Sequence, residues 1–117
     1  MTLLDELKDE VWRYSQTEAG NWLNEFAWAD VPVAFKNKLP GDIAGLYSFG
    51  KIVLLDADMS TIFPIYIHEL RHRWQWVKKP LKYLVGKLYR PLIEDDADTE
   101  QNKADEWYCE KADKERM

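Results

Sequence analysis

The chain has 117 residues, of which 46% are hydrophobic and 32% charged, and its net charge is −5. This composition excludes a disordered chain and supplies one compact core, so we expect a single domain over residues 1–117. The single cysteine, Cys109, excludes an internal disulfide and fits a reducing compartment. No apolar stretch is long enough to span a membrane, and residues 1–6 do not resemble a secretory signal. We therefore expect a cytoplasmic protein without a membrane partner.

Residues 1–30 are expected to form a helical arm. Apolar side chains recur at helical spacing over residues 2–17, and Thr2 and Asp5 are placed to form a capping box at the start of this helix. A second apolar set follows, which predicts either a second helix or a continuation of the first. The arm ends by Pro32.

Residues 33–56 carry the pattern of β structure. Residues 33–35 predict a short strand, and two extended runs, 44–49 and 51–56, flank Gly50 as the arms of a hairpin do. We therefore expect an α+β fold with a short antiparallel hairpin, or a three-stranded sheet, packed on the helix that follows.

Residues 60–78 predict a helix with one apolar stripe. Ser60 or Thr61 is placed to cap it, and Pro64 is tolerable within its first turn. The stripe consists of Phe63, Ile67, Leu70, Trp74 and Val77. Because these five side chains supply the core-facing surface, other residues of the helix are left at the edge of the core, where a cleft would form.

The only two histidines of the chain lie on this helix, beside the apolar stripe. His68 and His72 are four residues apart, which places them one turn apart on the same face. Two imidazoles in that geometry can hold one metal ion, and Glu69 between them stands where a base is useful. The alternative is two partly exposed histidines on an ordinary helix.

A third metal ligand has to be a carboxylate, because no further histidine or cysteine pair remains. The acidic helix predicted over residues 92–114 offers Glu94, and Asp98 on the same face is placed to accept the ring N–H of a liganding histidine. The alternative is that these acidic residues bind no metal and only stabilise the first turn of the helix, where the helix dipole favours negative charge. Glu100 and Asp105 are other candidate ligands, although Glu100 points away from the Glu94 face.

The pattern His68-Glu69-Leu70-Arg71-His72, followed by Glu94 and Asp98, resembles that of the gluzincin metallopeptidases. The preceding hairpin is similar to the strand pair of small members, the SprT-like and ImmA/IrrE-like families. The resemblance covers residues 44–107 and implies a zincin-like domain with a small antiparallel sheet, in which an edge strand lines the cleft and pairs with an extended peptide. No downstream histidine is available as an oxyanion donor, a departure from the pattern.

The resulting hypothesis is a zinc-dependent peptidase acting on a peptide or protein substrate. Zinc is held by His68, His72 and Glu94, and Glu69 is the general base. The candidate oxyanion donors are Tyr47, Tyr83, Tyr89 and Arg90. The competing hypothesis is a non-catalytic zinc-binding or partner-binding protein, which would not require Glu69.

The charge of the chain is distributed unevenly along the sequence. Residues 71–90 contain seven basic side chains and no acidic one, whereas residues 94–117 contain ten acidic and four basic ones. The negative net charge argues against nucleic acid as the main partner, and the basic run leaves a DNA-associated role open. Two solvated faces that pair across the fold are the simpler explanation.

Overall fold

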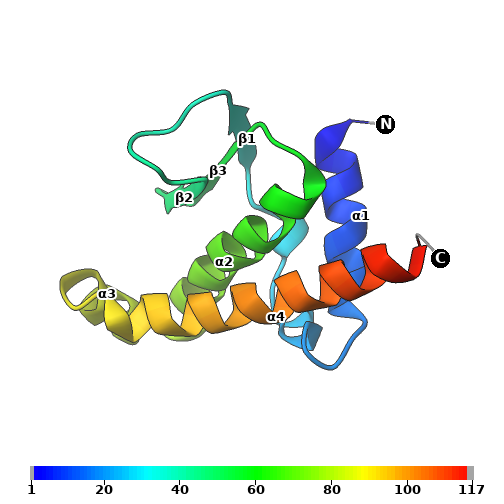
Figure 1. Cartoon of the computed structure of the whole chain (residues 1–117). Coiled ribbons are helices and arrows are strands. Elements are labelled where there is room, and N and C mark those ends of the chain that lie inside the picture. Colours follow the sequence, from blue (N-terminus) through cyan, green and yellow to red (C-terminus); the bar gives the residue numbers. More distant parts are fainter. Residues whose placement is uncertain (1, 116–117) are drawn as a thin grey trace.

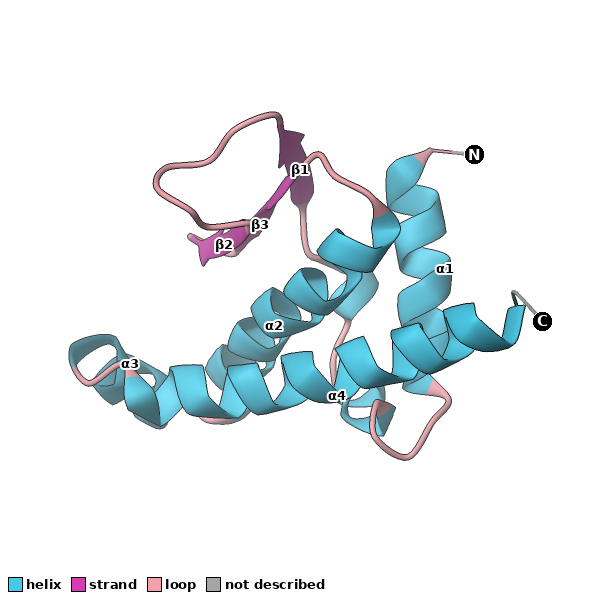
Figure 2. Cartoon of the chain, viewed as in Figure 1, coloured by secondary structure: helices cyan, strands magenta, loops and turns pink. Residues whose placement is uncertain are grey.

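A computed structural model describes residues 2–115, which form an α+β fold of four α-helices and a small three-stranded sheet. The sheet lies over one side of helix α2, α4 runs along another side, and α1 stands at the end away from α3 (Figures 1 and 2). The elements in chain order are α1 (Leu3–Ser15), η1 (Asn21–Glu25), η2 (Trp28–Asp30), β1 (Val33–Lys36), β2 (Gly45–Ser48), β3 (Lys51–Leu55), α2 (Met59–Lys78), α3 (Pro80–Leu88) and α4 (Pro91–Glu115).

The N-terminal arm packs behind α2 and contributes to the same core. The predicted capping box of Thr2 and Asp5 is confirmed, with both reciprocal hydrogen bonds present at the start of α1. The second apolar set forms the two short 3₁₀ helices η1 and η2 instead of an α-helix. Tyr14 is fully buried, and its ring meets Phe63 of α2 edge-on at 5.8 Å between centroids.

The sheet has the strand order β1-β3-β2 and is mixed. The hairpin prediction is confirmed, because β2 and β3 pair antiparallel around a turn in which Phe49 and Gly50 both have positive φ. The expectation of a purely antiparallel sheet is wrong for β1, which pairs parallel with β3. β3 takes the central place because its alternate side chains, Ile52 and Leu54, are the fully buried ones. β2 is consequently an edge strand.

Helix α2 begins one residue earlier than predicted, and its cap differs. Asp58 is the N-cap, and its carboxylate accepts hydrogen bonds from the hydroxyls of Ser60 and Thr61, so neither of these residues caps the helix itself. Pro64 lies beyond the first turn, in the second. The last member of the predicted stripe, Val77, is 46% exposed and so lies outside the core.

Two of the helices begin with a proline. Pro80 is the first residue of α3, and Pro91 is the first residue of α4, where the missing backbone N–H costs nothing. α4 packs on α2 through a buried stripe of Ile93, Ala97, Glu100 and Ala104. None of the helices within residues 2–115 is long and apolar enough to cross a membrane.

α3 approaches α4 closely at Gly86, and this contact generates a stability prediction. A Cβ atom at Gly86 would lie 2.4 Å from Cγ2 and 3.3 Å from Cβ of Ile93, a stiff β-branched side chain. Gly→Ala in a helix usually stabilises a protein, but here we expect Gly86→Ala to lower the free energy of unfolding by about 1–3 kcal/mol.

Urea denaturation of the purified variants measures this effect. Val85→Ala is the matched control, because Val85 is the neighbouring α3 residue and is 54% exposed. Its change should stay within about 0.5 kcal/mol. A Gly86→Ala protein as stable as wild type would show that the two helices separate without cost.

Candidate metal centre

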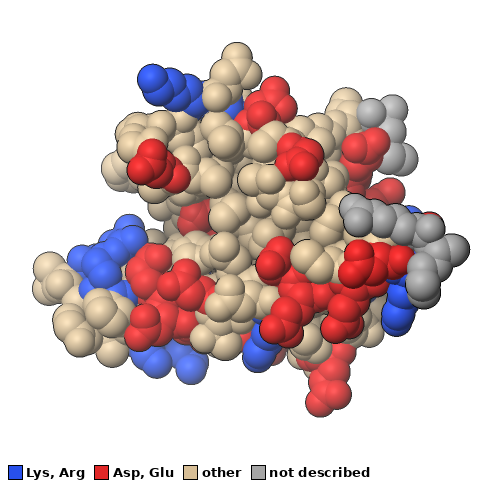
Figure 3. Space-filling view, viewed as in Figure 1, with Lys and Arg blue, Asp and Glu red and all other residues tan. Residues whose placement is uncertain are grey.

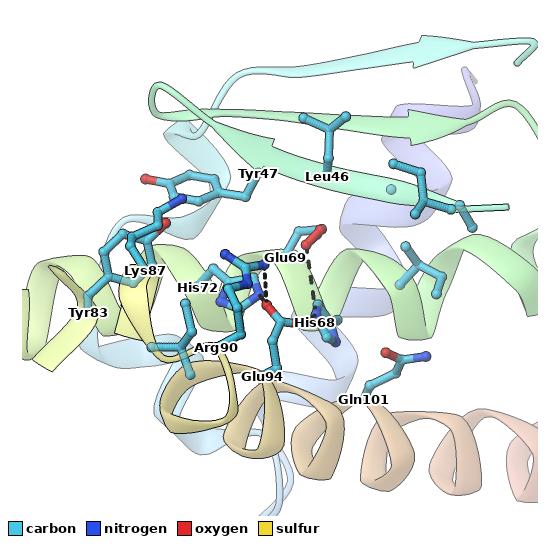
Figure 4. A pocket seen from close by; sticks show the side chains of 15 residues that line it. Leu46, Tyr47, His68, Glu69, His72, Tyr83, Lys87, Arg90, Glu94 and Gln101 are labelled. Atoms are coloured by element: carbon cyan, nitrogen blue, oxygen red, sulfur yellow. Dashed lines mark hydrogen bonds and ion pairs between the residues drawn. The ribbon is translucent and has the colours of Figure 1, made fainter. Parts of the chain in front are cut away.

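Two helices bring three possible metal ligands together. The ring nitrogen Nε2 of His68 lies 3.2 Å from Glu94 Oε2, and Nε2 of His72 lies 2.9 Å from Glu94 Oε1. One ligand atom from each residue lies within 4.8 Å of the other two. Figure 4 shows the two rings on α2 and the Glu94 carboxylate rising from α4 toward them. His72 is only 5% exposed, so the alternative of two partly exposed histidines does not describe it.

A buried glutamine, absent from the sequence hypothesis, orients His72. Gln75 Oε1 lies 2.9 Å from His72 Nδ1, while Gln75 Nε2 donates to the Ile93 carbonyl and to Asp96 Oδ2, each at 2.9 Å. Because the Ile93 carbonyl and Asp96 can only accept hydrogen bonds, the amide N–H₂ of Gln75 has to face them, and its oxygen has to face the His72 ring. His72 Nδ1 therefore carries a proton and donates it to Gln75.

Asp96, the second acceptor for Gln75, is itself held by an arginine. Arg71 donates to both oxygens of Asp96, at 2.8 and 3.1 Å, and its guanidinium stacks 3.7 Å from the centroid of the Trp74 ring. Burial raises the pKa of Asp96, but hydrogen bonds from Arg71 and Gln75 outweigh this effect and bring the pKa below its ordinary value. The result is a continuous chain of contacts from Arg71 to His72.

Asp98 lies where the sequence placed it, beside His68. Its Oδ1 is 3.2 Å from His68 Nδ1, although the angle at the ring falls outside that of a hydrogen bond. The Asp98 side chain is 60% exposed. The two histidines thus face partners of different kinds through Nδ1, a buried amide for His72 and a solvated carboxylate for His68.

The charges at the centre shift one another's ionisation. Hydrogen bonds with His68 and His72 hold the pKa of Glu94 well below its ordinary value. Burial lowers the pKa of His68, but the hydrogen bond to Glu94 and the nearby carboxylates outweigh this effect and raise it overall. Burial also raises the pKa of Glu69, whose side chain is 6% exposed and has Oε1 4.0 Å from His68 Nε2.

The chemistry of this donor set fits a metal ion. With a proton on His72 Nδ1, the neutral ring has its lone pair on Nε2, which faces an acceptor oxygen of Glu94 at 2.9 Å. Two lone pairs at this distance require a cation between them, either a proton or a metal ion. Ligands around tetrahedral zinc stand about 3.3 Å apart, so the 2.9 and 3.2 Å separations need only a small expansion.

The three ligands open into a cleft of about 380 Å³ between β2, α2, α3 and the start of α4. Of the candidate oxyanion donors, Tyr47, Tyr83 and Arg90 line this cleft, whereas Tyr89 is exposed and outside it. Two of the three are engaged: the Tyr47 hydroxyl accepts from Arg73 at 3.3 Å, and Arg90 donates to Glu94 at 2.9 Å.

The alternative carboxylates of α4 lie away from the histidines. Glu100 belongs to the buried stripe that packs on α2 and pairs with Lys103 at 3.4 Å. Asp105 is exposed, about three turns beyond Glu94 along the helix. Among the described residues, Glu94 alone completes a group of three metal-binding side chains with His68 and His72.

Comparison with known proteins adds no family assignment. No protein-family model, curated protein or solved structure matches the chain. The site therefore has to be argued from its own geometry.

The amide of Gln75 generates a prediction about metal affinity. Gln75→Leu keeps the size of the side chain but removes the acceptor that fixes the His72 tautomer, so we expect zinc affinity to fall about 10- to 100-fold. Competition with a chromogenic chelator measures the affinity. Gln101→Leu is the matched control, because Gln101 lines the same cleft on α4, and it should bind zinc as wild type does. Equal affinity of both variants would exclude Gln75 as an orienting group.

Proposed function

We propose that the chain is a zinc-dependent peptidase whose metal is held by His68, His72 and Glu94. The observation that supports this function is the place of Glu69. Its carboxylate is buried in the wall of the cleft, next to the two histidines, and no ion pair with a lysine or arginine neutralises it among the described residues. A site that served only to tie two helices together would not require a carboxylate there.

Glu69 is suited to move a proton. When bound, zinc supplies the Lewis acidity that polarises a peptide carbonyl and lets a water molecule lose a proton near neutral pH. The Glu69 carboxylate accepts that proton and passes it to the nitrogen of the leaving amine. Because burial raises the pKa of Glu69 above its ordinary value, the carboxylate is a stronger base toward the proton of the water.

The walls of the cleft favour an extended peptide. β2 pairs with β3 on one side only, so its other edge is available for backbone hydrogen bonds to a bound segment. Residues 43–47, which include the first three residues of β2, line the cleft together with the proposed metal ligands. Leu46 and Tyr47 lie across the cleft from Glu94 (Figure 4). A peptide added at this edge would run past Glu69.

The metal ligands generate the first test. We expect the purified protein to bind one zinc ion per chain. Glu94→Ala should weaken zinc binding by more than about 100-fold, the upper range for loss of a residue that only hydrogen-bonds to a metal ligand. Glu100→Ala is the matched control on the same helix and should change the affinity little, because Glu100 lies on the packing face. Metal analysis and chelator competition measure both. If Glu94→Ala retained wild-type affinity, the ligand assignment would be wrong.

The role of Glu69 generates the second test. Glu69→Gln keeps the shape of the side chain but cannot accept a proton, so kcat/KM for a cleaved peptide should fall about 10²- to 10⁴-fold while zinc binding persists. Candidate peptides come from a library incubated with the wild-type protein. Full activity of Glu69→Gln would exclude the general-base role. A wild-type protein that binds zinc but cleaves no peptide would favour a structural metal site instead.

A further inference from the structure

Helix α3 exposes its apolar face to solvent. Its buried residues are Tyr83 and Gly86, which face the rest of the protein. The aliphatic side chains on the opposite side are exposed, and we call them the α3 arc: Leu81 (78% exposed), Leu84 (52%), Val85 (54%) and Leu88 (91%). At about 100° per residue, the centre of the α3 arc is about 180° from the centre of the buried pair. This helix is amphipathic, yet its apolar side is not the one that packs.

Basic side chains border the α3 arc on both sides. On the helical wheel, Lys82 stands about 60° beyond Val85, and Lys87 stands about 60° beyond Leu84 on the other side. Lys78 and Lys79, also exposed, precede the helix. Figure 3 shows blue side chains gathered at this end of the molecule, whereas much of α4 is red. The long aliphatic stems of lysines allow such a border to reach charged groups while the arc is buried.

The whole molecule is polarised in the same direction. Residues 71–90 carry a charge of +7, and the net charge is −5, so the remainder carries −12 (−5 − 7 = −12). α4 runs from the α3 end toward the opposite end of the molecule, and most of its acidic side chains lie toward that opposite end (Figures 1 and 3). An anionic surface would therefore attract the α3 end and repel the other, although Glu94, Asp95, Asp96 and Asp98 also lie near the attracted end, where Arg90 and Arg71 pair with Glu94 and Asp96.

We propose that the α3 arc and its lysine border form a docking surface for an anionic lipid bilayer. Exposed leucines, a lysine on each side of them, and the exposed ring of Tyr89 at the C-terminal end of α3 are the composition of a helix that lies in the interfacial layer of a membrane. The earlier expectation of no membrane partner rested on the absence of a spanning segment, and an interfacial helix needs none.

Other occupants fit the arc less well. Nucleic acid would satisfy the lysines but would leave four aliphatic side chains against a phosphate backbone. A second copy of α3 would cover the leucines but would bring two lysine borders together. The inference is independent of the proposed peptidase, since no residue of the α3 arc belongs to the metal centre.

Co-sedimentation with lipid vesicles tests the proposal on the full chain. Wild type should bind phosphatidylcholine vesicles that contain about one third phosphatidylglycerol, bind pure phosphatidylcholine much more weakly, and be released by high salt. Leu84→Ser/Leu88→Ser should lower the partition coefficient at least about tenfold for each leucine removed. Lys82→Gln/Lys87→Gln should lower it about fivefold for each charge.

The matched control removes two exposed aromatic rings from other surfaces. Trp12→Ser/Phe49→Ser alters residues that are 60% and 104% exposed on α1 and the β2–β3 turn, and it should bind the vesicles as wild type does. Circular dichroism verifies that each variant is folded. Leu84→Ser/Leu88→Ser with wild-type vesicle binding would overturn the proposal. The proposal would also be overturned if the wild-type protein were a dimer by light scattering and did not bind vesicles, and if this variant were a monomer. A second copy of the chain would then cover the arc.

Discussion

The Glu94 carboxylate reaches both histidine rings only because α4 packs along α2 in one register. Ala97 and Ala104, both fully buried, allow the two helices to approach closely. Gln75 then fixes the register, since its amide donates to the Ile93 carbonyl and to Asp96 one residue before and two residues after Glu94. A slip of α4 by one residue would turn Glu94 by about 100° away from the rings. The geometry of the candidate centre and the packing of the two longest helices therefore depend on the same register of α4 on α2.

The polar groups in this interface are costly to bury in so small a protein. Glu69, His72, Gln75 and Glu100 are all less than 9% exposed, and each would lower stability if it lacked a partner. Apolar side chains of similar size would pack the same helices without that cost. Three of these four side chains, Glu69, His72 and Gln75, lie on α2 at or next to the candidate metal centre.

Local spacing predicted which side chains meet at the candidate metal centre better than it predicted the sheet. The four-residue separation of His68 and His72 determines their common face once α2 is a helix, and the same reasoning placed Glu94 beside Asp98 on α4. The parallel pairing of β1 was missed because strand partners depend on contacts between distant segments, which period-two patterns do not encode. The fold class and the order of the main elements followed from the periodicity of the apolar residues.

Two further features of the structure were not predicted from the sequence, and both for the same reason. Gln75 was missed because a glutamine in a helix carries no spacing signal, and its role depends on the Ile93 carbonyl, 18 residues away. The exposed apolar face of α3 is the second feature, because periodicity identifies a face without stating what covers it. In both cases the missing information was the position of one helix relative to another, which a single sequence does not contain.

The contact between Gly86 and Ile93 has a thermodynamic consequence. α3 touches both ligand-bearing helices next to their ligands: Tyr83 meets the His72 ring at 6.4 Å between centroids, and Gly86 packs on the residue before Glu94. Because Gly86 has no side chain, its backbone packs directly on the Ile93 side chain, and a displacement of α3 would be transmitted to that residue. A molecule that bound to the protein more tightly when α3 is in one position than in another would therefore change the affinity of the centre for metal. Linkage then requires the metal to change the affinity of that molecule by the same factor.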